Sequence, residues 1–350
     1  MSPRWRPEVA GRLDLRNGRV ELAHGGGGRA MERLIGELFR AALANEWLDA
    51  AADAARFEAP AGPLVMATDS HVVSPLFFPG GDIGSLAVNG TVNDVAMGGA
   101  RPLYLAAGFV LEEGFPLADL RRIVESMAEA SRRAGVPVIT GDTKVVEGGK
   151  GDGVYINTTG LGAVIEGLEV GPERVRPGDR ILVSGPIGDH GVAILSRRED
   201  IGFGTELRSD TAALHGLVAA MAEAVPAIRC LRDPTRGGLA AVLNEIAHAS
   251  GTGLVIREEA VPVREEVRAA CEFLGLDPLS SANEGRLVAF CPPEAADDLL
   301  AAMREHPLGR EAAIIGEAVA DERAFVQMET AFGGRRMIDW LYGEQLPRIC

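Results

Sequence analysis

Two spacings of hydrophobic residues predict the helices and strands of the first half of the chain. Apolar side chains recur every three or four positions over residues 31–42 and Leu117–Ala134, which is typical of helices with one buried face. A third helix, from Gly84 to about Gly98, is apolar almost throughout. Short apolar runs predict strands at Leu64–Ala67, Leu103–Leu111, Val136–Thr140 and Tyr155–Ile165. Strands and helices alternate, so we expect an α/β domain that closes near residue 167.

The second half mixes strands and helices in a similar way. A strand at Ile181–Ser184 opens it, and helices are expected at 211–224, after Leu239, at 264–274 and at 294–305. Further strands are expected at 253–257, 286–290, 312–315 and 325–328. The predicted fold class is α/β plus α+β in two domains. We divide the chain into an arm with a Gly-rich loop and a helix (1–57), an N-terminal α/β domain (58–167), a C-terminal α+β domain (168–339) and a mobile tail (340–350).

Composition restricts the kind of protein but not its chemistry. The 350 residues are 47% hydrophobic and 24% charged, as in folded globular proteins. A net charge of −15 argues against nonspecific binding to nucleic acid or to anionic membranes. The sequence has no signal-peptide pattern, no apolar run of about 20 residues and no CxxC pair among its four cysteines. We expect a cytoplasmic protein in which Cys271 and Cys291 are buried core thiols.

Three acidic residues lie where a strand, a loop and a helix could bring them together. Asp69 follows the first strand, Asp82 precedes a helix, and Asp94 lies within that helix. Each could instead be a helix cap or an ion-pair partner. As a group they favour a phosphate bound through Mg²⁺, which prefers carboxylate ligands together with phosphate oxygens. The Gly25–Gly28 run before a helix could wrap phosphate or act as a hinge.

Other polar residues have equally open interpretations. Lys144 could pair with Asp142 or reach a phosphate or a substrate. His190 lies in a Gly-rich turn that favours a turn or capping role, and Thr235 is a possible cap of the following helix. The chain ends on Cys350, which places a thiol on a segment expected to swing freely; an ordinary frayed terminus is the alternative.

Taken together, several stretches resemble one family. They are Ala23–Arg29, Thr68–Val73, Asn89–Ala96, Thr140–Val146, Ser184–Gly191, Arg232–Gly238, Asn283–Gly285 and the terminal Pro-Arg-Ile-Cys. From about residue 20 to the last residue the chain resembles the [NiFe]-hydrogenase maturation carbamoyl dehydratases. These belong to the ATP-binding superfamily of aminoimidazole ribonucleotide synthetase, selenophosphate synthetase and thiamine-phosphate kinase.

The resemblance implies a two-domain fold whose N-terminal domain dimerises through its sheet, with ATP near that interface. By motif, Asp69, Asp82, Asp94 and Asp233 are expected to hold Mg²⁺ and the phosphates. Gly25, Gly26, Gly27 and Gly28 are expected to cover the nucleotide, with Asn93, Asp142 and Thr143 as further nucleotide contacts. Lys144 and Glu284 are expected to act on the substrate.

The implied reaction converts a carbamoyl group on Cys350 into a cyano group. Phosphorylation by ATP would turn the poor leaving oxygen into phosphate, and Glu284 or Lys144 would act as the base. Expected partners are a second copy of the chain, a carbamoyltransferase that loads Cys350, and an iron-carrying scaffold that accepts cyanide.

Two alternatives remain open at this point. Selenophosphate synthetase shares the acidic ATP site but resembles a chain with a reactive Cys or selenocysteine and a Lys near its Gly-rich arm. Residues 1–57 contain neither Cys nor Lys, which counts against it. A non-catalytic scaffold that relays a ligand on its terminal thiol is the second alternative, and ATP turnover separates it from an enzyme.

Overall fold

The first half of the chain is built on a four-stranded sheet. The computed structural model describes residues 12–199, 207–340 and 348–350. The strand order is β1 (Leu64–His71), β6 (Val154–Val164), β4 (Ala100–Glu112) and β5 (Val138–Val146). β6 runs antiparallel to both of its neighbours, and β4 and β5 are parallel. Side chains alternate between the two faces of each strand, so one face is available for helices and the other is left open.

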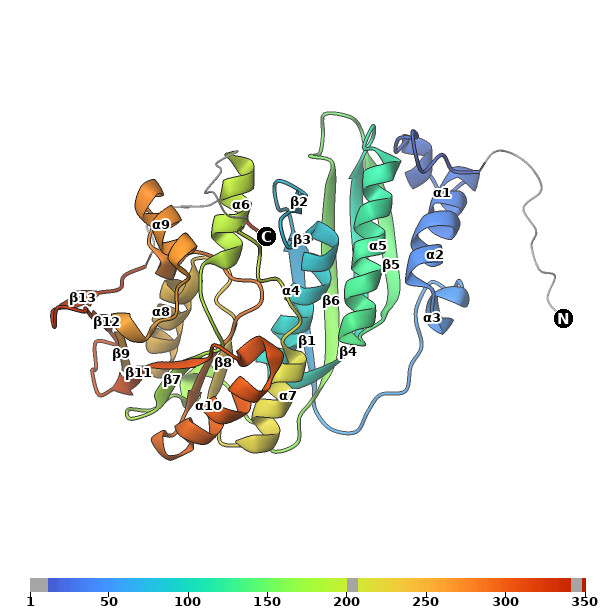
Figure 1. The fold of residues 1–350 in the computed structure, drawn as a ribbon. Helices are drawn as coiled ribbons and strands as arrows, with labels where there is room; N and C mark the ends of the chain where they lie inside the picture. Colours follow the sequence, from blue (N-terminus) through green and yellow to red (C-terminus); the bar gives the residue numbers. More distant parts are fainter. Residues whose placement is uncertain (1–11, 200–206, 341–347) are drawn as a thin grey trace.

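Two long helices cover one face of this sheet (Figure 1). α5 (Leu117–Ala134) buries Leu120, Ile123, Val124 and Met127, as its spacing predicts, and ends at Gly135 with a left-handed φ of 67°. α4 (Ile83–Met97) is buried on nearly all sides. Its apolar surface suits that position, because it packs on the sheet and α5 and also touches α7 and β8 of the second half.

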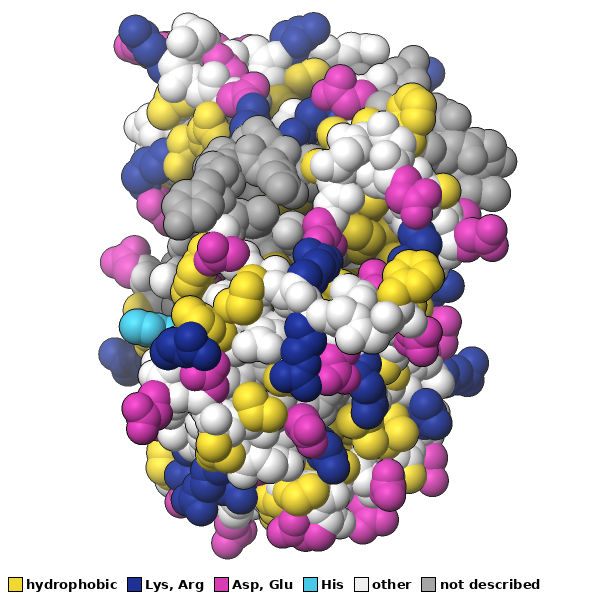
Figure 2. Space-filling view, turned by 90° about the vertical axis from the view of Figure 1, so that its left-hand side faces the viewer, with side chains coloured by type: hydrophobic (Ala, Val, Ile, Leu, Met, Phe, Trp, Pro, Cys, Tyr) yellow, Lys and Arg dark blue, Asp and Glu magenta, His cyan; other side chains and the backbone are white. Residues whose placement is uncertain are grey.

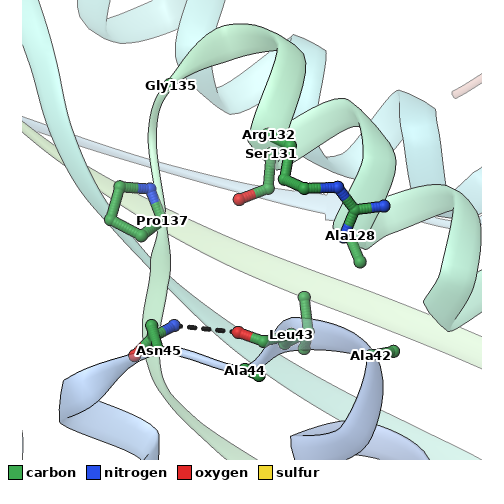
Figure 3. A pocket seen from close by; sticks show the side chains of 9 residues that line it. All are labelled: Ala42, Leu43, Ala44, Asn45, Ala128, Ser131, Arg132, Gly135 and Pro137. Carbon is green, nitrogen blue, oxygen red and sulfur yellow. Dashed lines mark hydrogen bonds between the residues drawn. The ribbon is translucent and has the colours of Figure 1, made fainter.

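The N-terminal helices extend the layer formed by α5. α1 (Arg29–Leu34) continues through a π-helical segment (Ile35–Phe39) into α2 (Arg40–Leu43), and α3 (Glu46–Asp49) follows. Phe39 meets Phe109 of β4 edge to face at 4.8 Å. Figure 3 shows a hollow between α2 and the end of α5, where Asn45 donates to the Leu43 carbonyl at 3.0 Å. No carboxylate lines this hollow, so it is distinct from the predicted acidic site.

The second half holds a seven-stranded mixed sheet and most of the remaining helices. The strand order is β13 (Arg335–Met337), β12 (Val326–Glu329), β9 (Gly253–Arg257), β11 (Ala313–Val319), β7 (Arg180–Val183), β10 (Val288–Cys291) and β8 (Cys230–Arg232). The helices are α6 (Asp189–Arg198), α7 (His215–Ala224), α8 (Gly238–Ser250), α9 (Glu265–Leu274) and α10 (Ala296–Glu305). A small β2–β3 hairpin (Phe77–Phe78, Gly81–Asp82) lies on the first half, facing α6 (Figure 1).

The two-domain fold class is confirmed, and some predicted details are wrong. The helix expected from residue 211 begins at His215. Thr235 does not cap α8, which begins after Gly237 in a left-handed conformation (φ 73°). β1 and β5 continue through the polar residues expected to follow them. Cys271 and Cys291 are buried, as predicted.

The described surface gives no sign of a membrane-spanning element. Within residues 12–199, 207–340 and 348–350, no helix combines the length and apolar character needed to cross a bilayer. Figure 2 shows one face of the second half, where basic and acidic side chains are interspersed and hydrophobic ones form small separate groups. The negative net charge is therefore not gathered into a single patch on this face.

Candidate active site

The end of the chain lies in the junction between the two halves. The Val72 amide donates to the Cys350 carbonyl at 2.9 Å, and the Ser74 amide donates to the Arg348 carbonyl at 3.1 Å. Cys350 is only 6% exposed, so the expectation of an exposed thiol is wrong for this conformation. Residues 341–347 of the predicted tail, with Leu346 and Pro347, lie outside the described residues, as do residues 1–11 of the predicted arm.

Four carboxylates from four different elements form a cluster beside the docked thiol, and two of them, Glu284 and Asp69, act on that thiol directly. Asp69 comes from β1, Asp94 from α4, Asp233 from the segment after β8, and Glu284 from the loop before β10. The charges of Asp233, Asp69 and Asp94 each raise the pKa of Glu284. The charges of Asp233 and Asp69 also raise the pKa of Asp94. A side-chain carbon on Gly90 of α4 would lie 3.8 Å from Asp69 Oδ2 and 3.9 Å from Glu284 Oε2, so these two oxygens converge above the same helix turn. The missing side chain at Gly90 makes room for them.

Burial and mutual repulsion raise the pKa values of three of these carboxyl groups, those of Asp94, Asp233 and Glu284. Burial, followed by the charges of Asp233 and Asp69, raises the pKa of Asp94 to about 7. Burial also raises the pKa of Asp233 to about 6. The pKa of Glu284 is raised well above its usual range by burial and by neighbouring acids. Its Oε1 atom has no hydrogen-bond partner in the described part of the chain.

This arrangement fits a positively charged or hydrogen-bond-donating ligand. A buried carboxylate cluster with an unpaired oxygen is stabilised when a cation or a donor supplies the missing interaction. Among the described residues, however, no three His, Cys, Asp or Glu side chains are arranged closely enough to hold a metal ion by themselves. Mg²⁺ binding therefore stays a prediction, and phosphate oxygens would have to complete the ligand set.

Arg236 contacts the terminal thiol directly. Its Nη1 donates to Cys350 Sγ at 3.3 Å. Burial, and then the charge of Glu284, raises the pKa of the Cys350 thiol to about 12, and Arg236 only partly opposes this. A thiol needs its thiolate form to act as a nucleophile, so Cys350 is inert as a nucleophile while it is docked here.

His71 also faces the cluster, and the sequence analysis gave it no role. It is 1% exposed, and its Nε2 lies 3.7 Å from Asp69 Oδ2. Neither ring nitrogen has a hydrogen-bond partner among the described residues, and burial lowers its pKa. The alternation of β1 was the available signal, because residues two apart on a strand share a face.

Asp82 and Asn93 make contacts within the protein that support the architecture of the site, and their predicted ligand contacts stay predictions. Asp82 Oδ1 accepts from the amides of Gly84 and Ser85 at 2.8 and 3.0 Å and caps α4. Asn93, 1% exposed, accepts from the Leu214 amide and donates to the Glu284 carbonyl. It thereby holds the loop that carries Glu284, and both hydrogens of its amide nitrogen are used, on the carbonyls of Ala212 and Glu284.

The remaining predicted residues form a second group on β5. Lys144 pairs with Asp142 at 2.5 Å, and this hydrogen bond is the main cause of the lowered pKa of Asp142. Gly25 packs against Val145, while Gly27 and Gly28 have open space around them. Thr143 is 3% exposed and faces the helix layer, which does not favour the predicted nucleotide contact.

The two groups do not meet within one chain. β5 and β1 form opposite edges of the four-stranded sheet, which places them about 14 Å apart at ordinary strand spacing. Lys144 also points to the open face, like its neighbour Val110 on β4, whereas Asp69 lies beside the buried Thr158 on the helix-covered face. Lys144 and the cluster that contains Glu284 therefore lie at opposite edges and on opposite faces of the sheet, and their joint action on one substrate stays a prediction.

Comparison with known proteins places this fold and site in a class. The families described as AIR synthase related protein, N-terminal domain and C-terminal domain, match residues 51–164 and 176–329. A carbamoyl dehydratase HypE from Azotobacter vinelandii is 72% identical over 339 residues, which cover 97% of this chain and 99% of that protein. A crystal structure of the hydrogenase maturation protein HypE in complex with ATP superposes with a TM-score of 0.91 at 51% identity, covering 94% of this chain and 99% of the other. A HypE–HypF complex gives a TM-score of 0.78 at 49% identity, covering 88% and 99%.

The fold is thus that of an AIR synthase-related protein. Within that class, the identity along nearly the whole chain is decisive, and the chain belongs to the HypE family of carbamoyl dehydratases.

Proposed function

We propose that this protein dehydrates a carbamoyl group carried on its own Cys350 to a cyano group, with consumption of ATP, in the maturation of a [NiFe]-hydrogenase. The family carries the name carbamoyl dehydratase, and one relative has been crystallised with ATP. The observation that carries the proposal is the position of the Cys350 thiol, which is buried beside Glu284 and Asp69, two members of the cluster that also contains Asp94 and Asp233. A group attached to that sulfur would be surrounded by the residues that phosphoryl transfer requires.

The proposed chemistry assigns separate tasks to these residues. ATP supplies the phosphoryl group that makes the carbamoyl oxygen a phosphate leaving group. Asp69, Asp94 and Asp233 would hold Mg²⁺ with the phosphates, which neutralises the repulsion that raises the pKa of Asp94 and Asp233. Glu284 is our proposed base. Its unpaired Oε1 can accept a hydrogen bond from the amide, and a raised pKa strengthens it as a proton acceptor.

The atoms of the reaction balance without any further reactant. The carbamoyl oxygen leaves with the phosphoryl group as inorganic phosphate, its bond to carbon breaks, and the two amide protons are lost as the carbon–nitrogen triple bond forms. The products are the S-cyano tail, ADP, phosphate and one net proton. Arg236 would fix the sulfur throughout, since it already donates to Sγ.

A homodimer would bring Lys144 to the tail of the other subunit. Leu64, Met66 and Val110 are 44%, 72% and 37% exposed on the strands of the N-terminal sheet. A sheet face with exposed apolar side chains is a suitable self-association surface. Because Lys144 shares that open face, we propose that it acts across the dimer, and that Gly25–Gly28 and Asp142 assist there with the nucleotide.

Two further partners follow from the chemistry. One HypE has been crystallised in a complex with HypF, and we propose that the HypF-type carbamoyltransferase loads Cys350. Since the docked thiol is protonated and shielded, loading must use an undocked tail. The product cyanide would then pass to an iron-carrying scaffold.

Intact-mass spectrometry of the full chain tests this function. After incubation with carbamoyl phosphate, ATP, Mg²⁺ and the active carbamoyltransferase, we expect the mass of one added carbamoyl group and then that mass less one water. Cys350→Ala should show neither species, and Asp94→Ala should stop at the carbamoyl form. If the wild-type chain is loaded but never loses water while ATP is present, the dehydratase function is excluded and a ligand-relay role is favoured.

A further inference from the structure

His190 contacts the docked tail one residue before the thiol. It is fully buried on α6, and its Nε2 lies 2.7 Å from the Ile349 carbonyl oxygen. Its Nδ1 lies 2.7 Å from Ser209 Oγ, and its ring stands edge to face on Phe78 at 5.6 Å. A carbonyl oxygen only accepts, so Nε2 must carry the hydrogen and Nδ1 must accept from the Ser209 hydroxyl. The imidazole is therefore held in one tautomer and one orientation.

The backbone carbonyls of Arg348 and Cys350 are also bound from the body of the protein. The Arg348 carbonyl accepts from the Ser74 amide and from Arg198 Nη2 at 2.9 Å. The Cys350 carbonyl accepts from the Val72 amide. The Ile349 side chain is buried as well, with 4% exposure. Two side chains therefore donate to backbone carbonyls near the chain end, Arg198 to Arg348 and His190 to Ile349. The bond from His190 is the one nearer to the thiol.

We propose that His190 is a positioning residue that latches the tail in the site and so divides the catalytic cycle between loading and dehydration. The inference rests on the proposed function, because only that function needs both a docked and an undocked tail. Without the Nε2 donor, the Ile349 carbonyl would be buried without a partner, and the docked state would lose stability relative to the undocked one. Loading, which uses the undocked thiol, would not suffer, whereas dehydration would.

The reaction of Cys350 with iodoacetamide measures the docked fraction without any catalysis. Cys230, Cys271 and Cys291 are buried, so mass analysis of the C-terminal peptide from the native chain reports on Cys350. We expect His190→Phe, which fills the space but cannot donate, to raise this rate about tenfold, the scale of one lost buried hydrogen bond. His190→Gln retains a donor and should stay within about threefold of wild type. His215→Phe, a partly buried histidine on α7, is the matched control and should not change the rate.

The two half-reactions give a second readout that a purely structural role would not move. His190→Phe should accept the carbamoyl group at least as fast as wild type and lose water about tenfold more slowly. Wild-type rates of alkylation and dehydration in folded His190→Phe would overturn the latch. Should His190→Phe fail to fold, Ser209→Ala, which removes the partner of the ring Nδ1 and also the acceptor of the Thr211 amide, decides: faster alkylation supports the latch and an unchanged rate overturns it. If alkylation changes as expected but wild type never dehydrates, the proposed function fails and the latch stands.

Discussion

Neutralising Asp94 should stabilise the protein while it abolishes its activity. Asp94 is a largely buried carboxylate whose pKa is raised from 3.8 to about 7 by burial and by the charges of Asp233 and Asp69. The folded state therefore holds a proton more tightly than the unfolded chain does. Its contribution to stability is complete below pH 3.8 and is lost as the pH rises through about 7. Asp94→Asn removes this dependence, because the amide is neutral at every pH.

The expected magnitude follows from the difference between the two pKa values. At 1.36 kcal/mol per pH unit, the ionised carboxylate costs the folded state about 4 kcal/mol at pH 8 and about 1.5 kcal/mol at pH 5. These figures are upper limits, because Asp233 shares the repulsion and its own pKa falls when Asp94 is neutral. We expect Asp94→Asn to be more stable than wild type at pH 8, by a margin that shrinks by more than half at pH 5.

Urea unfolding of the full chain in the presence of a chelator measures both free energies. Asp298→Asn, an exposed carboxylate on α10, is the control and should change the free energy of unfolding little. Saturating Mg²⁺ and ATP should stabilise wild type more than the variant. The cation would neutralise the repulsion between Asp94 and its neighbouring carboxylates, and the variant no longer has that repulsion. The reasoning is refuted if Asp94→Asn is no more stable than wild type at pH 8, or if its advantage is the same at both pH values.

Three further predictions concern the rest of the site. Mixing inactive Lys144→Ala with inactive Cys350→Ala should restore dehydration, because a mixed dimer brings one intact tail to the partner's lysine; no recovery after verified subunit exchange would mean that Lys144 acts within its own chain. Met66→Glu should convert the dimer to monomers in light scattering, since it places charge on the 72%-exposed apolar position of the open sheet face; an unchanged mass would move the interface elsewhere. Gly90→Ala should slow dehydration at least tenfold, on the scale of about 1.4 kcal/mol, because its methyl group would come within 3.1 Å of His71 Cε1 and displace the imidazole that lies beside Asp69. Gly36→Ala, which meets nothing within 4 Å, is its control and should keep full activity.

The spacing of hydrophobic residues predicted correctly those helices whose ends depend on residues close to them in sequence. α5 begins and ends at the predicted residues, because its buried face repeats every three or four positions and Gly135 stops it. The start of α7 was predicted too early. The side chains of residues 211–214 are compatible with a helix, but their backbone amides donate to groups outside α7. The amides of Ala212 and Leu214 donate to Glu284 and Asn93, which are distant in sequence, and the amide of Thr211 donates to the Ser209 hydroxyl.

For the site as well, local sequence patterns identified candidate residues but not the contacts between residues that are distant in sequence. The positions of Asp69 and Asp94 at a strand end and within a helix suggested that they converge, whereas Asp233 and Glu284 were brought in only through the family resemblance. An acid ahead of a helix is ambiguous between a cap and a ligand, and Asp82 proved to be a cap. Arg236 and His190 were missed as tail contacts because their partners lie 114 and 159 positions away.

The fate of the carbamoyl oxygen tests the central claim most directly. A tail loaded with ¹⁸O-labelled carbamoyl and then given unlabelled ATP and Mg²⁺ should release one labelled inorganic phosphate for each S-cyano tail formed. That result requires the oxygen to leave on phosphorus, as the carboxylate cluster around Cys350 implies. Label appearing in water, with unlabelled phosphate, would mean that ATP hydrolysis only accompanies the dehydration, and it would contradict the account.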